Sequence, residues 1–325
     1  MENNTHEENN FITIQLLKSI TQETYRVALT IIFILGIIGH LLNVRLFTRS
    51  TMIKNSCCNY FLASSCIDLI RLFFSVFVRM LDLGYNINTR EFTIDWWCKI
   101  RLSITCTTYL ISSVLNTLAS FDRYASSCRQ SRYRNFCQTM VARRIIPIVI
   151  VLVCISNSHM SFNLVIVNGK CWTRPGWYQI IYDIFFMVMY NLCYPLLSGI
   201  FALLTIRNMR RCHIAHAYKV KIKDFQRMIL THLICFILLT MPFTIHKLYN
   251  GVTIYYPKDL LQHEWENLSQ CIVSILCFAN DASGFYIYSL SSRKFRREFL
   301  ASISICKPHW SKEKFRYLPR FIVFN

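Results

Sequence analysis

The chain has 325 residues, of which 54% are hydrophobic and only 16% are charged, whereas a soluble domain usually carries about 25% charged residues. Its 36 Lys and Arg against 17 Asp and Glu give a formal net charge of +19, which excludes an acidic disordered tail. The small numbers of Gly (8) and Pro (7) exclude collagen-like and low-complexity chains, so the hydrophobic excess favours a membrane protein.

Seven predominantly apolar runs follow one another along the chain, each close to the roughly 20 residues that a helix needs to cross a bilayer. They are residues 27–47, 60–83, 100–119, 145–167, 180–206, 228–245 and 268–290. The second run is the weakest because it contains Asp68, Arg71 and Arg79. Lipid offers backbone groups no partner outside their own helix, so the runs predict an all-α membrane protein with a seven-transmembrane-helix bundle. The sequence shows no β-hairpin punctuation and no internal repeat.

Basic residues predict the orientation of this bundle. Alternate segments hold 25 of the 36 Lys and Arg, namely 45–56, 122–144, 207–227 and the part after 290. The positive-inside rule places these segments in the cytoplasm and the N-terminus outside. Nucleic-acid binding is the competing interpretation of a basic protein, but these charges flank spans rather than forming one stripe, so we expect membrane lipids and no nucleic acid as partners. The predicted parts are an extracellular segment 1–26, a transmembrane domain 27–290, and a cytoplasmic segment 291–325.

Features of the predicted outer side agree with this orientation. Both N-glycosylation sequons, at Asn3 and Asn267, fall outside. The first 24 residues are too polar for a cleavable signal peptide, so the first span is expected to act as a signal anchor. Of 15 cysteines only Cys98 and Cys171 lie in predicted extracellular segments, while cytosolic thiols stay reduced. A Cys98–Cys171 disulfide is therefore predicted, and two unpaired thiols remain the alternative.

A three-residue motif marks the inner end of the third run. Asp122, Arg123 and Tyr124 are consecutive, and Arg123 follows Cys98 by 25 positions. This motif, at this spacing and at the inner end of the third of seven spans, resembles that of rhodopsin-like (class A) G-protein-coupled receptors over about residues 27–299. The resemblance implies that Asp122 pairs with Arg123 at rest and that activation frees Arg123 to face a heterotrimeric G protein. The ordinary alternative is an interfacial basic anchor.

Landmarks in the last three spans extend the resemblance. Pro195 and Pro242 stand where the family has its fifth- and sixth-helix prolines. Residues 280–288 read NDASGFYIY, similar to invertebrate FMRFamide- and myosuppressin-type peptide receptors, with Phe285 where most relatives have Pro. Segment 293–299 resembles the short amphipathic eighth helix, whose basic residues would face anionic headgroups.

Several family positions are altered here. The first span has Gly39-His40 where the family has Gly-Asn, Gly284 replaces the seventh-helix Asn, and the tryptophan that usually stands two residues before the sixth-helix proline is missing. These changes bear on how the receptor would switch between states. The residues expected at switch positions are Phe236, Thr240, Pro242, Phe285 and Tyr288.

Asp68 corresponds to the second-helix acid that holds an allosteric sodium ion in the family, and Ser112 and Asn280 match its polar neighbours. Hard oxygen ligands suit such a cation. Arg71, however, lies three residues after Asp68 on the same helix face, and Asp281 adjoins Asn280. We therefore expect Arg71 to neutralise Asp68 or Asp281 and to weaken or replace the sodium site. The alternative is that Arg71 only extends toward the membrane surface, and no other cofactor or metal is expected.

The outer halves of the spans are expected to hold the ligand. Thr105 stands seven residues after Cys98, where amine receptors place an ammonium-binding Asp, which argues against a biogenic amine. The mixed charges of the other candidate pocket residues suit a peptide: Arg79, Asp82, Asp183, His246, Lys247, Tyr249 and Gln270.

The sequence thus predicts a receptor that binds an extracellular ligand, a neuropeptide in the leading hypothesis, and activates a G protein. A chemosensory receptor for a small molecule is the first alternative, and a transporter or channel is the second. No kinase motif set, nucleophile elbow, P-loop or metalloprotease motif is present in the sequence, so we do not expect an enzyme.

Overall fold

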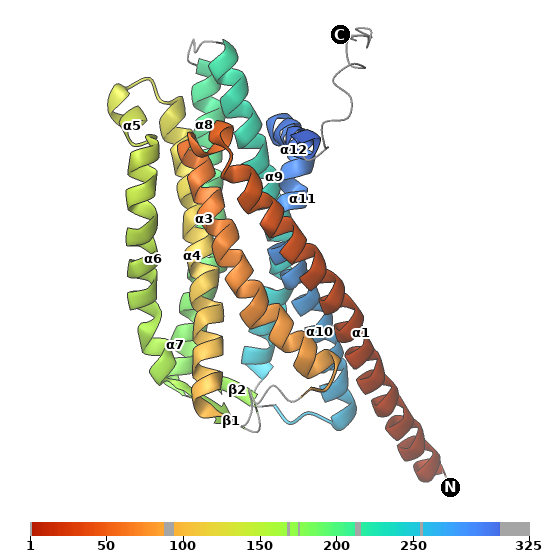
Figure 1. Ribbon diagram of the computed structural model, residues 1–325. Coiled ribbons are helices and arrows are strands. Elements are labelled where there is room, and N and C mark those ends of the chain that lie inside the picture. The colour runs from red at the N-terminus through yellow and green to blue at the C-terminus, as the bar shows by residue number, and fades with distance from the viewer. Residues whose placement is uncertain are drawn as a thin grey trace.

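The computed structural model describes residues 2–87, 94–167, 170–174, 176–211, 216–253 and 256–305. Within these ranges the chain forms an elongated bundle of helices that run side by side, and α1 projects beyond the others at its N-terminal end (Figure 1). The first half contains α1 (Glu2–Phe47), α2 (Ser50–Ile53), α3 (Ser56–Arg71), the π-helical stretches η1 (Leu72–Phe77) and η2 (Met80–Gly84), α4 (Asp95–Ser127), α5 (Ser131–Asn135) and α6 (Thr139–Phe162). The second half contains β1 (Leu164–Val167), β2 (Lys170–Thr173), α7 (Trp177–Phe186), η3 (Met187–Cys193), α8 (Tyr194–Arg211), α9 (His216–Thr253), α10 (Leu260–Ala282), α11 (Gly284–Ser291) and α12 (Arg293–Ile305).

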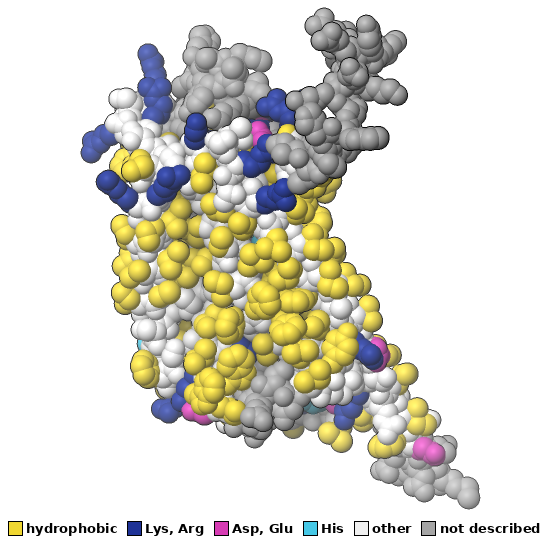
Figure 2. Space-filling view, viewed as in Figure 1, with side chains coloured by type: hydrophobic (Ala, Val, Ile, Leu, Met, Phe, Trp, Pro, Cys, Tyr) yellow, Lys and Arg dark blue, Asp and Glu magenta, His cyan; other side chains and the backbone are white. Residues whose placement is uncertain are grey.

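The helices confirm the prediction of an all-α, multi-pass membrane protein. Six helical stretches among the described residues are long and apolar enough to span a bilayer, and α10 with α11 makes a seventh if this pair, bent by 58°, counts as one span. Apolar side chains cover the middle of the bundle, and Lys and Arg gather at the end with α5 and α12 (Figure 2). We call this the basic end, and the opposite end, with β1 and β2, the hairpin end.

The first helix is longer than the sequence predicted. The apolar run starts at 27, but α1 starts at Glu2. Only the added turns from about Leu17 onward pack against α10, where Lys18 Nζ lies 3.6 Å from Glu264 Oε1 and Leu17 is buried, whereas residues 8–12 are exposed. Tertiary contact therefore supports only the part of the added helix that lies nearest the bundle.

The end of the fourth run was predicted wrongly. Residues 145–167 read as one helical span without a hairpin, but α6 ends at Phe162, and β1 pairs with β2 in antiparallel register. The four residues of β1 are Leu, Val, Ile and Val, a composition that suits a strand. The predicted disulfide is present: it joins Cys171 in β2 to Cys98 at the start of α4, with 5.6 Å between the Cα atoms. The hairpin is thereby fixed to the end of α4.

The fifth span changes helical geometry near its middle. The π-helical η3 separates α7 from α8, directly before Pro195. A proline has no amide hydrogen, and its ring displaces the carbonyl four residues earlier, so a widened turn at this point has a clear local cause. In α9, by contrast, Pro242 lies inside a single continuous helix.

The break between α10 and α11 leaves backbone carbonyls that need partners in lipid. Ser283 Oγ donates to the carbonyl of Asn280 at 2.7 Å. His40 Nε2, from α1, donates to the carbonyl of Asp281 at 2.8 Å. The bend is thus stabilised both by its own serine and by a side chain of another helix.

The helix α12 begins at Arg293, as predicted, and continues to Ile305. Its Phe295 is fully buried at the basic end, against the rings of Phe47 and Phe285. Arg293 and the other arginines on its outer face are exposed. The buried apolar core of the basic end therefore joins α12 to α1 and α11, which fixes where the last helix lies.

Candidate functional site

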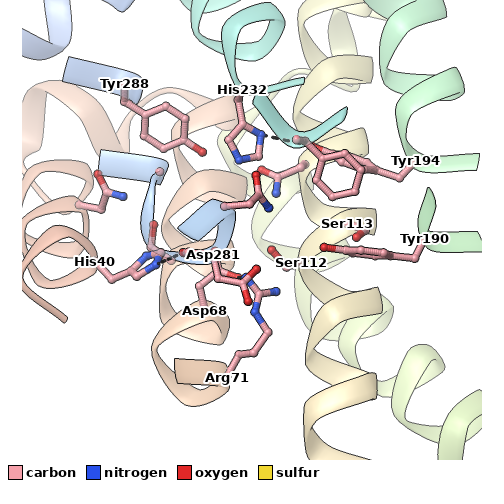
Figure 3. A pocket seen from close by; sticks show the side chains of 16 residues that line it. His40, Asp68, Arg71, Ser112, Ser113, Tyr190, Tyr194, His232, Asp281 and Tyr288 are labelled. Atoms are coloured by element: carbon pink, nitrogen blue, oxygen red, sulfur yellow. Dashed lines mark hydrogen bonds and ion pairs between the residues drawn. The ribbon is translucent and has the colours of Figure 1, made fainter. Parts of the chain in front are cut away.

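A buried charge cluster occupies the middle of the bundle. Arg71 of α3 places NH2 2.9 Å from Asp68 Oδ1 and 3.0 Å from Asp281 Oδ1 of α10. Tyr109 of α4 donates its hydroxyl to Asp281 Oδ2 at 2.7 Å, and its ring centroid lies 4.4 Å from the Arg71 guanidinium carbon. We call Asp68, Arg71, Tyr109 and Asp281 the central cluster, and Figure 3 shows the three charged members. Three helices are tied together by these contacts.

A small polar cavity lies beside the central cluster. All five residues that the sequence assigned to a sodium or charge network line it: Asp68, Arg71, Ser112, Asn280 and Asp281. Ser112 Oγ lies 2.9 Å from Ser64 Oγ, which in turn donates to Asp68 Oδ2 at 3.3 Å. Asn280 Oδ1 is buried without a hydrogen-bond partner.

The arrangement does not fit the sodium ion that the resemblance implies. The guanidinium of Arg71 lies between the two carboxylates that such an ion would approach, within ion-pair distance of both. The side chains of Arg71 and Asp281 are only 5% and 0% exposed, so the pairing is shielded from solvent. A cation fixed covalently to α3 therefore takes the position next to Asp68, and among the described residues no group of His, Cys, Asp or Glu is arranged to hold a metal ion.

The consecutive Asp122 and Arg123 lie in a second buried cluster, near the basic end of α4. Arg123 donates through Nε and NH2 to Asp122 Oδ2, the former at 3.1 Å. Its NH2 also donates to Asn55 Oδ1 at 3.0 Å. From α9, the ring of Phe225 has its centroid 5.4 Å from the guanidinium carbon. We call Asn55, Asp122, Arg123 and Phe225 the basic-end cluster.

Asn55 has two roles in this cluster. It is the N-cap of α3, where its Oδ1 accepts from the backbone N–H of Cys57 at 3.3 Å, and the same oxygen accepts from Arg123. Tyr124 lies apart from these contacts, because its ring stacks on Phe201 of α8 at 5.9 Å between centroids. The three motif residues thus point in different directions, and only two of them share a cluster.

A cysteine closes the basic-end cluster toward α5. Cys137 Sγ donates to the backbone carbonyl of Asp122 at 3.2 Å. Burial, with a further contribution from the negative charge of Asp122, raises the pKa of the Cys137 thiol to about 12. The group therefore stays a protonated donor at neutral pH.

An aromatic column runs from the hairpin end toward the central cluster. Successive rings lie 4.5–6.2 Å apart between centroids along Tyr178, Tyr182, Phe186, Tyr190, Phe236 and Tyr194. Tyr190 also contacts Tyr109 edge to face at 5.2 Å. The predicted switch residue Phe236 is buried between Tyr190 and Tyr194, which place it in direct contact with this column.

The other predicted switch positions lie in α9 and α11. Thr240 is buried and donates to the carbonyl of Phe236 at 2.8 Å, two residues before the carbonyl of Leu238, to which Pro242 cannot donate. Phe285 packs on Phe295, while Tyr288 lies near His232 with 5.9 Å between ring centroids. Phe285 and Tyr288 belong to the apolar core of the basic end, and Tyr288 also lines the polar cavity, whereas Thr240 is in neither group, so these residues do not form one shared site.

The predicted ligand residues of α7 and α9 are paired with each other. Lys247 Nζ lies 2.7 Å from Asp183 Oδ1, and the two side chains are 35% and 31% exposed. Lys247 Nζ also lies 5.8 Å from the ring centroid of Phe186, in the aromatic column. An accessible pair of opposite charges is thus joined to the column.

The remaining candidates form polar contacts on α9 and α10 or lie deeper. His246 Nε2 lies 2.7 Å from Ser269 Oγ, and Tyr249 donates to Glu266 Oε1 at 3.0 Å. Gln270 donates to Ser274 at 2.8 Å, and the buried Thr105 to the carbonyl of Arg101 at 2.9 Å. Arg79 faces the ring of Phe278 at 5.6 Å, and Asp82 lies in η2 with its own interaction partner. None of the predicted ligand residues lines the polar cavity.

Of the two sequons, one can be described. Asn267 lies within α10 and donates to Glu264 Oε2 at 3.3 Å. The side chain of Asn3 and the tail 306–325 lie outside the described residues.

Sequence reasoning missed several residues that complete these clusters. Tyr109 precedes the predicted Ser112 by about one turn, so its position on the same face of α4 was a usable signal. Asn55 precedes α3 as a typical N-cap residue. No local pattern pointed to His40 as the partner of the α10 backbone, because that contact joins segments 241 positions apart.

No protein-family model matches the sequence, and no curated protein is significantly similar to it.

Proposed function

We propose that this chain is a rhodopsin-like G-protein-coupled receptor of the plasma membrane, with the hairpin end outside and the basic end in the cytoplasm. The observation that carries the proposal is the environment of Arg123. It lies near the basic end of the third apolar helix, is held by Asp122 and Asn55, and meets Phe225 of α9. An arginine held in this way becomes available to a cytoplasmic partner when α9 moves away.

The charge distribution supports the proposed orientation. Lys and Arg gather at the basic end (Figure 2), and the positive-inside rule associates that side with the cytoplasm. The disulfide Cys98–Cys171 lies at the opposite end, where an oxidising environment would maintain it. Two independent chemical features thus favour the same orientation.

Signalling in this proposal is a shift between two pre-existing states. A ligand can shift such an equilibrium only by its difference in affinity for the two states. The aromatic column gives a continuous packed route from the Asp183–Lys247 pair to Phe236, six residues before Pro242. Phe236 lies on the inner side of Pro242, in the part of α9 that continues to the contact with Arg123. Repacking of Phe236 would therefore move this inner part of the helix relative to the proline.

The proposed ligand is a peptide. Asp183 and Lys247 offer both signs of charge in side chains that are about one-third exposed, which suits a ligand with its own acidic and basic groups. Thr105 has no carboxylate to pair with a ligand ammonium, and its hydroxyl donates to the carbonyl of Arg101. An amidated neuropeptide fits these features better than a biogenic amine.

The test is G-protein activation in cells that express the full chain. A panel of G-protein sensors is read first without ligand and then with a library of amidated peptides, at surface levels matched through an N-terminal tag. Arg123→Ala is the loss-of-coupling variant. Arg132→Ala is its matched control, because Arg132 is an exposed arginine of α5 at the same end. We expect a peptide response that Arg123→Ala abolishes and Arg132→Ala retains.

The contrary outcomes separate the alternatives. A response to small-metabolite mixtures but to no peptide would replace the neuropeptide by a chemosensory ligand and keep the receptor. No basal or evoked signal from a well-expressed surface protein would contradict the proposal. Substrate-dependent current or uptake that survives Arg123→Ala would favour a transporter or channel.

A further inference from the structure

A carboxylate of α9 caps the first turn of α12. Ser292 donates its hydroxyl to Asp224 Oδ2. The backbone N–H groups of Arg293 and Lys294 donate to Asp224 Oδ1 at 3.0 Å and Oδ2 at 3.1 Å. Asp224 thus accepts three hydrogen bonds from the junction between α11 and α12.

These bonds are of a kind that stabilises a helix end. The first N–H groups of a helix have no partner inside the helix, and the positive end of the helix dipole favours an anion. A neighbouring residue usually supplies the cap, and here Ser292 Oγ also accepts from the N–H of Phe295 at 3.1 Å. The carboxylate, however, comes from 68 positions earlier in the chain, so α12 can complete its cap only while the inner end of α9 lies against it.

The next residue of α9 strengthens the same contact. The buried ring of Phe225 has the Arg123 guanidinium carbon 5.4 Å from its centroid and Lys294 Nζ 5.3 Å from it. Cation–π contacts of this kind are attractive. One turn of α9 therefore contacts both the basic-end cluster and α12.

A third residue in this turn opposes the arrangement. Gln226 is 3% exposed, and neither Nε2 nor Oε1 of its side chain has a hydrogen-bond partner. A buried amide without partners is costly, and that cost disappears if the helix end moves into contact with water. The contacts of Asp224 and Phe225 thus favour the observed arrangement, and the unpaired amide of Gln226 disfavours it.

We propose that Asp224 is a latch that holds the inner end of α9 against α12 and keeps Arg123 covered. Its release exposes the first N–H groups of α12 and removes Phe225 from the Arg123 guanidinium. That the latch restrains signalling rests on the proposed receptor function. That the latch exists does not, because the contact can be measured without any ligand or G protein.

Hydrogen–deuterium exchange of the full chain in lipid nanodiscs tests the latch. Asp224→Ala removes all three acceptor contacts, and Lys223→Ala is the matched control on the adjacent, exposed position. We expect amides in 293–297 and in the inner turns of α9 to exchange about 5- to 30-fold faster in Asp224→Ala, and Lys223→Ala to match the wild type. Ser292→Ala, which removes one of the three bonds, should give a smaller increase in the same segments.

Exchange in both segments that stays at the wild-type rate in Asp224→Ala and Ser292→Ala would overturn the latch. Basal G-protein signalling of the same variants then tests its role. A higher basal signal in Asp224→Ala than in Lys223→Ala supports the restraint. A signal that stays unchanged, in a chain that responds to ligand, overturns the restraint. A chain that activates no G protein contradicts the proposed function, while the exchange data still decide whether the latch exists.

Discussion

Arg71 and Arg123 are both 4% exposed, yet their surroundings differ in ways that suggest different roles. Arg71 contacts two carboxylates and an aromatic ring that come from α3, α10 and α4. Arg123 contacts the carboxylate of its own neighbour in the chain, one amide oxygen and the ring of Phe225.

The comparison separates a structural arginine from a releasable one. Moving Arg71 would leave the two carboxylates without their cationic partner in the middle of the bundle, where their side chains are only 13% and 0% exposed. Arg123 stays next to Asp122 when α4 moves, because the two residues are consecutive in that helix. It also lies near the basic end, where its long side chain can reach water. The contacts of the central cluster should therefore stay closed, whereas those of the basic-end cluster should open at a moderate cost in free energy.

Removal of the central arginine should have the largest effect. Breaking a buried ion pair by deleting one partner typically costs about 3–5 kcal/mol, because the remaining charge stays buried. We expect Arg71→Met to lower the apparent unfolding temperature in detergent far more than Arg123→Met does. Adding Asp68→Asn and Asp281→Asn to Arg71→Met should recover much of the loss, since no unpaired charge then remains. Equal destabilisation by the two single variants would contradict the comparison.

Tyr109→Phe should have the second largest effect. It removes the 2.7 Å hydrogen bond to Asp281 but keeps the ring beside Arg71. Such a bond inside a membrane protein is worth about 1–2 kcal/mol. Tyr178→Phe is the control, because the Tyr178 hydroxyl is buried without a hydrogen-bond partner. If both variants unfold at the wild-type temperature, the Tyr109 hydroxyl does not stabilise the central cluster.

Asn55→Ala should lower the unfolding temperature less than Tyr109→Phe does, but it should change G-protein signalling more. It removes an N-cap, which is worth about 1 kcal/mol, and it also removes an acceptor of Arg123. We expect a small fall in unfolding temperature together with a raised basal G-protein signal. Thr139→Ala, which removes a 2.9 Å bond to the carbonyl of Lys54 in the same region, should not raise the signal. An unchanged signal in Asn55→Ala would show that Asn55 does not restrain Arg123.

The mildest probe leaves both clusters intact and asks whether the basic-end cluster is closed. A thiol with a pKa near 12 has on the order of a thousandfold less thiolate at pH 8 than an ordinary cysteine with a pKa of about 8.5. Alkylation of Cys137 by iodoacetamide, followed by peptide mass spectrometry, should be correspondingly slow. It should accelerate about tenfold for each added pH unit below that pKa. A rate equal to that of a short cysteine peptide would mean that the cluster is open.

The sequence predicted the features that depend on long apolar runs and on which side of the membrane a cysteine lies. The spans, the disulfide and the start of α12 follow from hydrophobic length, cysteine distribution and a local pattern. The three charged residues of the central cluster, Asp68, Arg71 and Asp281, were named as a group, because a buried charge needs a partner and few were present, whereas Tyr109 was missed. The β-hairpin was missed because the residues of β1 are as apolar as those of a span. The polar part of α1 before residue 27 was not predicted to be helical, because it lacks the apolar run from which the spans were predicted.

Contacts made by polar side chains over long chain separations were the least predictable. His40 with the carbonyl of Asp281, and Asp224 with the start of α12, join elements whose approach depends on the whole bundle. No spacing in the sequence encodes these contacts. They are also the contacts that stabilise the helix break at Ser283 and complete the cap of α12.

The central claim is that this fold carries its own cation, the guanidinium of Arg71, where a sodium ion would otherwise lie. The most direct measurement is the apparent unfolding temperature of the wild type and Arg71→Met in equal concentrations of NaCl and KCl. A cation that binds the folded state specifically would raise that temperature. We predict no difference between the two salts for the wild type and a sodium-specific rise for Arg71→Met, whose two carboxylates have lost their partner. A sodium-specific rise in the wild type would contradict the claim.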